Sequence, residues 1–192
     1  MSPGPVRRFQ RIVGCADCNR DSSNTGVSVF LGTAPLLTES LLEAATSILT
    51  VKARHSTMLN TLNAGTAIPR PFDVPLTSNE ILAIASPFIS GCDLGVVANP
   101  SLAVTNVGPS TAGTAMTFSP VNEIVTVNRL LPDAHRRPDI RHPMPLEACV
   151  VAQVTNSPVA IWFTSDSQPL VGNAINRDAS QLLAGPRRAE LA

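Results

Sequence analysis

The stretch TESLLEAATSILTVKARHSTMLNTL, residues 38–62, decides how the first half of the chain folds. Apolar side chains recur in it at steps of three, four and their multiples, which predicts an amphipathic helix. The predicted core-facing stripe consists of Leu41, Ala45, Ile48, Leu59 and Leu62. Asn63, Gly65 and Pro69 follow the stretch and should end the helix.

Two capping-box spacings mark where helices should begin. Ser40 precedes Glu43 by three residues, and Thr77 precedes Glu80 by the same interval. The second box is followed by a short apolar run that closes at Pro87, so a shorter helix is expected there. The prolines between the two helices predict an extended connector.

The pattern changes to short alternating segments from about residue 99 onward. Strands are expected at residues 101–107, 114–118, 123–128, 149–154 and 159–164, with turn residues between them. Seventeen prolines and eleven glycines also argue against one continuous helical bundle. The predicted fold class is therefore α+β, with a helical part followed by a small antiparallel sandwich.

Composition excludes several classes of function. Fourteen basic and fourteen acidic residues give a net charge of zero, so neither nucleic acid nor an anionic membrane is an expected partner. An aromatic share of 4% with no tyrosine argues against a stacking platform for bases. No apolar run is long enough for a membrane-spanning helix, and we recognise no secretory signal peptide.

The four cysteines leave their roles open. Cys15 and Cys18 form a CxxC, but a second pair or a strand–helix context that would support zinc or redox chemistry is missing. Cys92 and Cys149 could pair as a disulfide in an oxidising compartment, or lie reduced in the core. Both alternatives stand at this point.

Lys52 and His55 form the one constellation that suggests metal chemistry. Stepping along the predicted stripe from Ile48 leads to Lys52 and then His55, so both should point toward the packed side. Carboxylate metal bundles project a Glu-x-x-His pair inward from a helix, but here lysine stands in the place of glutamate. A protonated ammonium has no lone pair to give, so a complete four-helix carboxylate site is not expected.

Several blocks in order resemble one protein family. The residues TGVSVFLGTAPLL (25–37) and LEAATSILTVKARH (42–55) are similar to helices three and four of the fungal ferritin-like proteins described as desiccation-related or stress-response proteins. PFDVPL (71–76), PFISGCDL (87–94) and PVAIWFTSDSQPL (158–170) continue the resemblance, which covers roughly residues 23–185.

The resemblance implies a ferritin-like domain with an immunoglobulin-like appendage and an extracellular location. In such proteins two further helices supply a Glu and a Glu-x-x-His. The helix-three carboxylate would fall near Ser22 or Ser23, and the helix-four Glu falls on Lys52. His55 is then a remnant metal-ligand position, and no cofactor is expected.

These inferences define an expected organisation. Residues 1–21 would be a disordered, unrelated head, 22–97 a truncated ferritin-like helical region holding helices three and four, 98–172 a β-sandwich and 173–192 a C-terminal tail. Leu41, Ile48, Leu59 and Leu62 would need a partner surface, supplied by a second copy or another protein.

The expected function is a degenerate, truncated ferritin-like protein that acts as a structural or interaction module in a stress-associated setting and is not an enzyme. Two alternatives remain. The first is a metalloprotein whose site is completed by oligomerisation. The second is a fragment of a complete family member that derives from an incomplete gene model.

Overall fold

The computed structural model describes residues 23–62, 65–68, 72–91, 93–106, 113–119, 126–130, 142–150, 158–171 and 174–190. The expected head at residues 1–21, with Cys15 and Cys18, lies outside them. The described residues combine helices with small antiparallel sheets, which confirms the α+β class. No helix among the residues described has both the length and the apolar character to cross a membrane.

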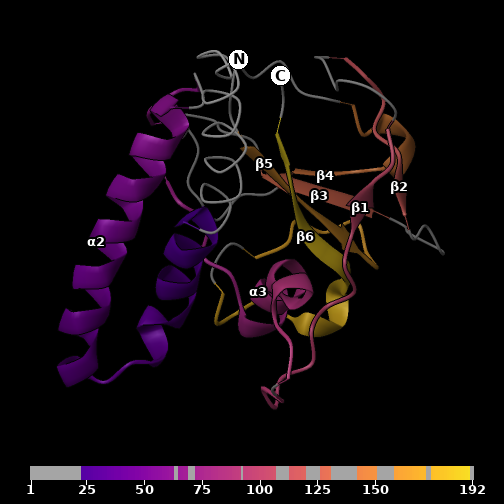
Figure 1. Ribbon diagram of the computed structural model, residues 1–192. Coiled ribbons are helices and arrows are strands. Elements are labelled where there is room, and N and C mark those ends of the chain that lie inside the picture. Colours follow the sequence, from indigo (N-terminus) through magenta and orange to yellow (C-terminus); the bar gives the residue numbers. More distant parts are fainter. Residues whose placement is uncertain are drawn as a thin grey trace, which may run out of the picture.

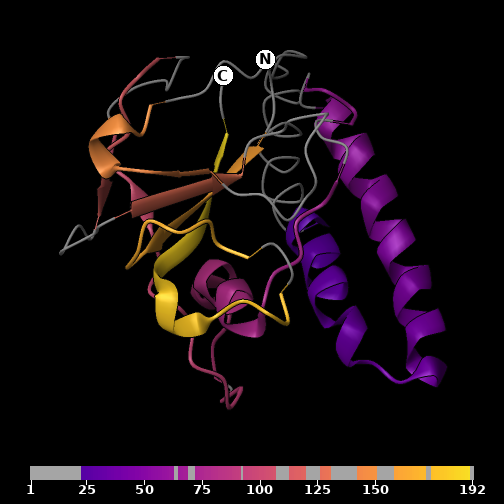
Figure 2. The same ribbon diagram turned by 180° about the vertical axis from the view of Figure 1, so that it is seen from behind.

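A helical hairpin forms the first part of the fold. Residues 23–33 are helical, a short 3-10 helix η1 (Ala34–Leu36) follows, and α2 (Glu39–Leu62) returns beside the first helix. Figures 1 and 2 show the pair at one side of the molecule, with α2 outermost. Gly26 permits close packing between them, since a Cβ there would lie 3.3 Å from Cδ of Lys52. α2 begins at Glu39, so Ser40 lies inside the helix and does not cap it.

The face that α2 buries differs from the predicted stripe. Its buried residues are Ala45, Ser56 and Asn60. The predicted Leu41, Ile48 and Leu62 are 56%, 44% and 52% exposed, so the prediction that they face the core is wrong. The fully buried positions carry small or polar side chains, and Leu49 and Leu59 are half-buried beside them, whereas five large apolar side chains lie exposed on another face.

The connector at residues 72–77 joins the hairpin to the rest of the molecule. The Leu76 amide donates to the carbonyl of Ser28, at 3.2 Å, in the first helix. Gly32 makes this crossing possible, because a Cβ at Gly32 would lie only 1.8 Å from the Leu76 carbonyl oxygen. Val74 and Leu76 then enter the core at 4% and 2% exposure. The connector therefore fixes the hairpin to the core through backbone contact.

The second helix, α3 (Ser78–Ala85), forms as predicted. Thr77 is its N-cap, and the capping box with Glu80 is complete in both directions. A short 3-10 helix, η2 (Ser86–Phe88), continues from it at Pro87. Local sequence alone fixes this element, because both partners of the box lie within one helical turn.

Two antiparallel sheets make up the second part. The larger has the strand order β4-β3-β5-β6, formed by β3 (Thr126–Leu130), β4 (His142–Met144), β5 (Pro158–Thr164) and β6 (Leu182–Glu190). The smaller pairs β1 (Ala103–Val104) with β2 (Phe118–Ser119). There are also two short 3-10 helices. η3 (Leu146–Ala148) lies between β4 and β5, and η4 (Ala179–Gln181) directly precedes β6.

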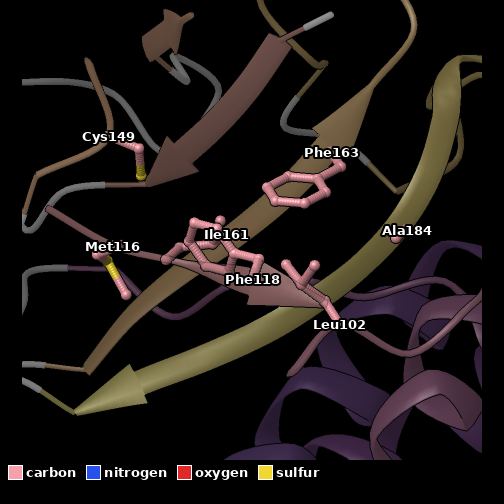
Figure 3. Close-up of a cluster of buried hydrophobic side chains, with 7 residues drawn as sticks. All are labelled: Leu102, Met116, Phe118, Cys149, Ile161, Phe163 and Ala184. Atoms are coloured by element: carbon pink, nitrogen blue, oxygen red, sulfur yellow. The ribbon is translucent and has the colours of Figure 1, made fainter. Parts of the chain in front are cut away.

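The side chains of β5 alternate between two hydrophobic clusters. On one face, Ile161 and Phe163 pack with residues from the β1–β2 region, and Figure 3 shows this cluster. Its members are Leu102, Met116, Phe118, Cys149, Ile161, Phe163 and Ala184. On the other face, Ala160 and Trp162 pack with Leu170, with the connector and with apolar residues of α3. The larger sheet thus lies between a small β layer and a helix.

Three expectations about the second half need correction. Residues 182–190 of the expected tail form β6, which pairs along β5. α3 contacts β6 and the second cluster, so the expected boundary at 97/98 separates elements that pack together. The strands expected at 101–107 and 114–118 shrink, within the described residues, to the two-residue strands β1 and β2. Of the strand expected at 149–154, residues 151–154 lie outside the described part, and Val150 forms an isolated bridge with Ala115.

Candidate functional site

The predicted metal position is not part of a core. His55 is exposed, which corrects the expectation that it points inward. Lys52 is half-buried, and its aliphatic stem lies against Gly26. The offset of three residues turns the two side chains about 60° apart around the helix, and only Lys52 remains beside the packed face. Ser23 is 8% exposed and lies on the first helix, while Ser22 lies outside the described residues.

No group of three or more His, Cys, Asp or Glu side chains that could hold a metal occurs among the residues the structure describes. Cys149 is 1% exposed within the first hydrophobic cluster. Cys92 falls outside the described part, so the Cys92–Cys149 pairing stays a prediction. Within the described residues, His55 therefore has no set of further ligands around it.

The most unusual surface of the described residues is an apolar stripe on α2. It consists of seven residues at alternating steps of three and four, which we call the α2 seam: Leu41, Ala44, Ile48, Val51, His55, Met58 and Leu62. All seven are exposed, and the five large aliphatic or thioether side chains among them are 38–57% exposed. Alternating spacing of this kind places side chains along one line of a helix, as in a coiled-coil interface. The α2 seam therefore extends along nearly the whole helix and is apolar except at His55.

The charged residues of α2 are distributed unevenly along the helix. Glu39 and Glu43 lie in the first third of α2, whereas Lys52 and Arg54 lie past its midpoint. Glu39, Glu43 and Arg54 are exposed, and Lys52 is half-buried. The helix is thus acidic toward its start and basic toward its end.

A second distinctive arrangement lies inside the molecule, between α3 and β5. The Arg177–Glu80 ion pair has both side chains fully buried. Oε1 of Glu80 accepts a hydrogen bond from Nε1 of Trp162 at 2.7 Å. Oε2 accepts from the Thr77 amide at 2.7 Å and from Nη1 of Arg177. We call Thr77, Glu80, Trp162 and Arg177 the buried polar cluster.

The remaining donors of Arg177 are also used. Nε donates to the Val171 carbonyl at 3.0 Å and Nη2 to the Pro75 carbonyl at 3.2 Å. Its Cζ lies 5.8 Å from the centre of the Trp162 ring, within the range of a cation–π contact. Burial lowers the pKa of Arg177 from its ordinary value, and the charge of Glu80 and its hydrogen bond act in the opposite direction.

This cluster is built as a structural connection. Both Glu80 oxygens accept hydrogen bonds from the protein, and the guanidinium contacts two backbone carbonyls besides Glu80. It joins the start of α3, the middle of β5 and the loop before β6. A buried carboxylate used in this way stabilises the native packing and is already engaged by its neighbours.

Sequence reasoning missed both arrangements for different reasons. The alternating spacing of Ala44, Val51 and Met58 was available in the sequence, but a stripe through Ala45 and Leu59 fits α2 almost as well. Nothing local indicates that Glu80 meets Arg177, because 97 residues separate them. Thr77 and Glu80 were identified only as a cap.

Comparison with known proteins adds no assignment to this geometry. No family model matches the chain, and no curated protein matches it.

Proposed function

We propose that the chain is a non-catalytic interaction module, a degenerate ferritin-like protein in a stress-associated setting, whose docking element is the α2 seam. The observation that carries this proposal is the exposure of the whole seam. Isolated exposed apolar residues are ordinary on protein surfaces, but a continuous line of them marks an interaction site. The seam extends along a helix of 24 residues, about 36 Å at 1.5 Å per residue.

The ferritin-like part of the proposal rests on the ordered sequence blocks and on the helix pair that precedes the sheet. In a carboxylate metal bundle, the position three residues before the histidine would carry a glutamate. Here Lys52 occupies it and lies with its stem against Gly26. With His55 exposed on the seam, the same helix offers an apolar docking surface in place of an inward ligand pair.

The docking role can be tested by photo-crosslinking from neighbouring positions. A photoreactive amino acid is placed at Met58, on the seam, or at Thr57, which is also exposed but lies on a different face. In cells that express the full chain, position 58 should form a discrete protein adduct and position 57 should not. Equal labelling from both positions, or no adduct from position 58, would contradict the proposal.

The metal role is tested separately on the purified protein. Titration with Fe²⁺ or Mn²⁺ should show no stoichiometric binding that depends on His55. If the protein binds one of these ions stoichiometrically and the His55→Ala variant does not, the alternative of a metal site completed by oligomerisation replaces the proposal. Restoring Lys52→Glu provides a further comparison, since a working site would gain metal affinity sharply.

A further inference from the structure

The burial of side chains along α2 bears on how firmly the helix is held. We propose that α2 is a strap, which opens from the first helix and recloses while the first helix, α3 and the sheets stay folded. The inference rests on the few side chains that α2 buries, on an unpaired hydroxyl in its buried face and on the separate attachment of the first helix. It concerns the stability of α2 and does not depend on the docking role.

α2 buries little side-chain surface for its length. Three of its 24 residues are buried, namely Ala45, Ser56 and Asn60, and none of them has a large apolar side chain. Leu49 and Leu59 are half-buried beside them. In proteins, most of the stability of a helix comes from the packing of its apolar face rather than from the helix itself. α2 therefore receives only weak support from its neighbours.

The centre of the larger sheet is held much more firmly. Residues 160–163 of β5 are 0–3% exposed, and they belong to the two hydrophobic clusters on either face of the sheet. The free energy of local opening ranges from near zero in segments with few buried contacts up to the global free energy of unfolding in the core. α2 and β5 should lie near opposite ends of this range.

The buried face of α2 also contains a polar group that lacks a partner. Within the described part of the chain, Oγ of Ser56 is buried and makes no hydrogen bond. The neighbouring Thr57 is exposed, and its hydroxyl donates to the Ala53 carbonyl at 3.2 Å. A buried hydroxyl without a hydrogen bond has lost its bonds to water and gained none in return. Because opening returns Ser56 to water, this side chain favours the open state.

The first helix has an attachment of its own. The Leu76 amide donates to the Ser28 carbonyl at 3.2 Å, and Gly32 lies directly against the Leu76 carbonyl. Both contacts are made to the connector and not to α2, so they remain when α2 opens. Figures 1 and 2 show α2 at the outer margin of the molecule, with the first helix on its inner side. The strap can therefore detach without disturbing the packing beneath it.

Opening of the strap would remove the α2 seam. The seam residues share one line only while α2 is helical, because their alignment depends on the helical repeat. α2 contains four threonines, a residue type of low helix propensity, so the detached segment has little tendency to stay helical. The opening equilibrium thus determines the fraction of molecules that present the seam.

The first test is native-state hydrogen exchange of the full chain, followed residue by residue by NMR. Amides 45–60 of α2 should have protection factors at least about a hundredfold lower than amides 160–163 of β5. If the two segments are equally protected, α2 opens only when the whole molecule unfolds, and the proposal is overturned.

The second test removes the unpaired hydroxyl. Ser56→Ala should raise the protection of α2 at least about tenfold, because it removes the unbonded buried oxygen and also improves helix propensity. Ser47→Ala is the matched control, since it makes the same change at an exposed position of α2 and should raise protection only about twofold. Equal effects of the two substitutions would show that the Ser56 hydroxyl does not favour opening.

The third test forces the strap open. Ala45→Glu places a charge in the buried face and should reduce the protection of α2 to that of an unfolded segment, while β5 and the fluorescence of Trp162 stay unchanged. Ala44→Glu, at the neighbouring exposed position, should keep α2 protected. If Ala45→Glu unfolds the sheet as well, α2 belongs to the same cooperative unit and the proposal fails.

These outcomes are separate from those of the docking experiment. A strap that opens as described supports this inference even if position 58 forms no adduct in cells, a result that contradicts only the docking role. An adduct from position 58 together with equal protection of α2 and β5 supports docking and overturns the strap.

Discussion

Removing the charge of Glu80 should be the most damaging conservative substitution in the described part of the chain. Glu80→Gln keeps the size of the side chain but leaves the guanidinium of Arg177 buried beside a neutral group. Each Glu80 oxygen accepts from an N–H donor. A glutamine has one acceptor oxygen, so its NH₂ group must face a donor whichever way the amide is turned.

The magnitude follows from these two effects. Breaking a buried ion pair by removing one partner costs about 3–5 kcal/mol, because an uncompensated charge remains in the interior. The total stability of a domain is typically about 5–15 kcal/mol, so this variant should lose a large share of it. The loss is larger than that of a surface pair, which contributes about 0–1 kcal/mol.

The assay is urea denaturation followed by the fluorescence of Trp162, the single tryptophan of the chain, which lies within the buried polar cluster. The double variant Glu80→Gln/Arg177→Met removes the buried charge together with its partner. The double variant should lose clearly less free energy of unfolding than the two single variants lose together, since no unpaired cation remains in the interior. A loss below about 1 kcal/mol for Glu80→Gln, or strict additivity in the double variant, would refute this reasoning.

Three further predictions concern other parts of the fold. Gly32→Ala should destabilise the protein by about 1–3 kcal/mol or more, measured by the urea midpoint, because its Cβ would overlap the Leu76 carbonyl; a neutral result would mean that the connector can move. Phe163→Ala should cost about 3–5 kcal/mol in the same assay through the lost packing and its edge contact with Phe118, at 4.9 Å between ring centres, whereas Phe88→Ala at an 87% exposed position should stay within about 0.5 kcal/mol. Hydrogen bonds from Ser180 lower the pKa of Asp178, so the stability difference between the wild-type chain and Asp178→Ala should be complete above the carboxyl pKa of the unfolded chain and should shrink as the pH falls through the lower folded-state pKa; a pH-independent difference would contradict this.

The elements that local sequence fixes could be predicted. The capping box of Thr77 and Glu80 determines where α3 begins, and periodic apolar residues establish that α2 is a helix. Ile161 and Phe163 alternate with Ala160 and Trp162, so β5 was recognised as well. In each case the interacting residues lie close together along the chain or repeat with a fixed period.

The elements that depend on distant partners could not be predicted. Residues 173–192 are expected to form a tail, yet Gly185 and Pro186 lie within β6, where Gly185 adopts φ +98° and the register against β5 shifts. The glycine supplies a left-handed conformation that other residues rarely adopt. Pairing with β5, some twenty residues earlier in the chain, determines that these residues form part of a strand.

The buried face of α2 was ambiguous for another reason. Two apolar stripes share Leu41, Ile48 and Leu62, and the sequence does not indicate which side the neighbouring helix covers. The deciding residue is Gly26 on the first helix, which brings that helix against Lys52 and leaves small side chains in the contact. The exposed stripe is the candidate site. His55, which was predicted to point inward, lies on this stripe.

The 97-residue separation between Glu80 and Arg177 has a consequence for the order of events on the ribosome. The two helices of the hairpin are synthesised before α3 and the sheets, and they lie next to each other along the chain. The carboxylate of Glu80 then emerges long before its guanidinium partner and before β6, which supplies the edge of the larger sheet. The sheet and its helix can therefore reach their final packing only when β6 has left the exit tunnel, while the α2 seam is accessible well before that point.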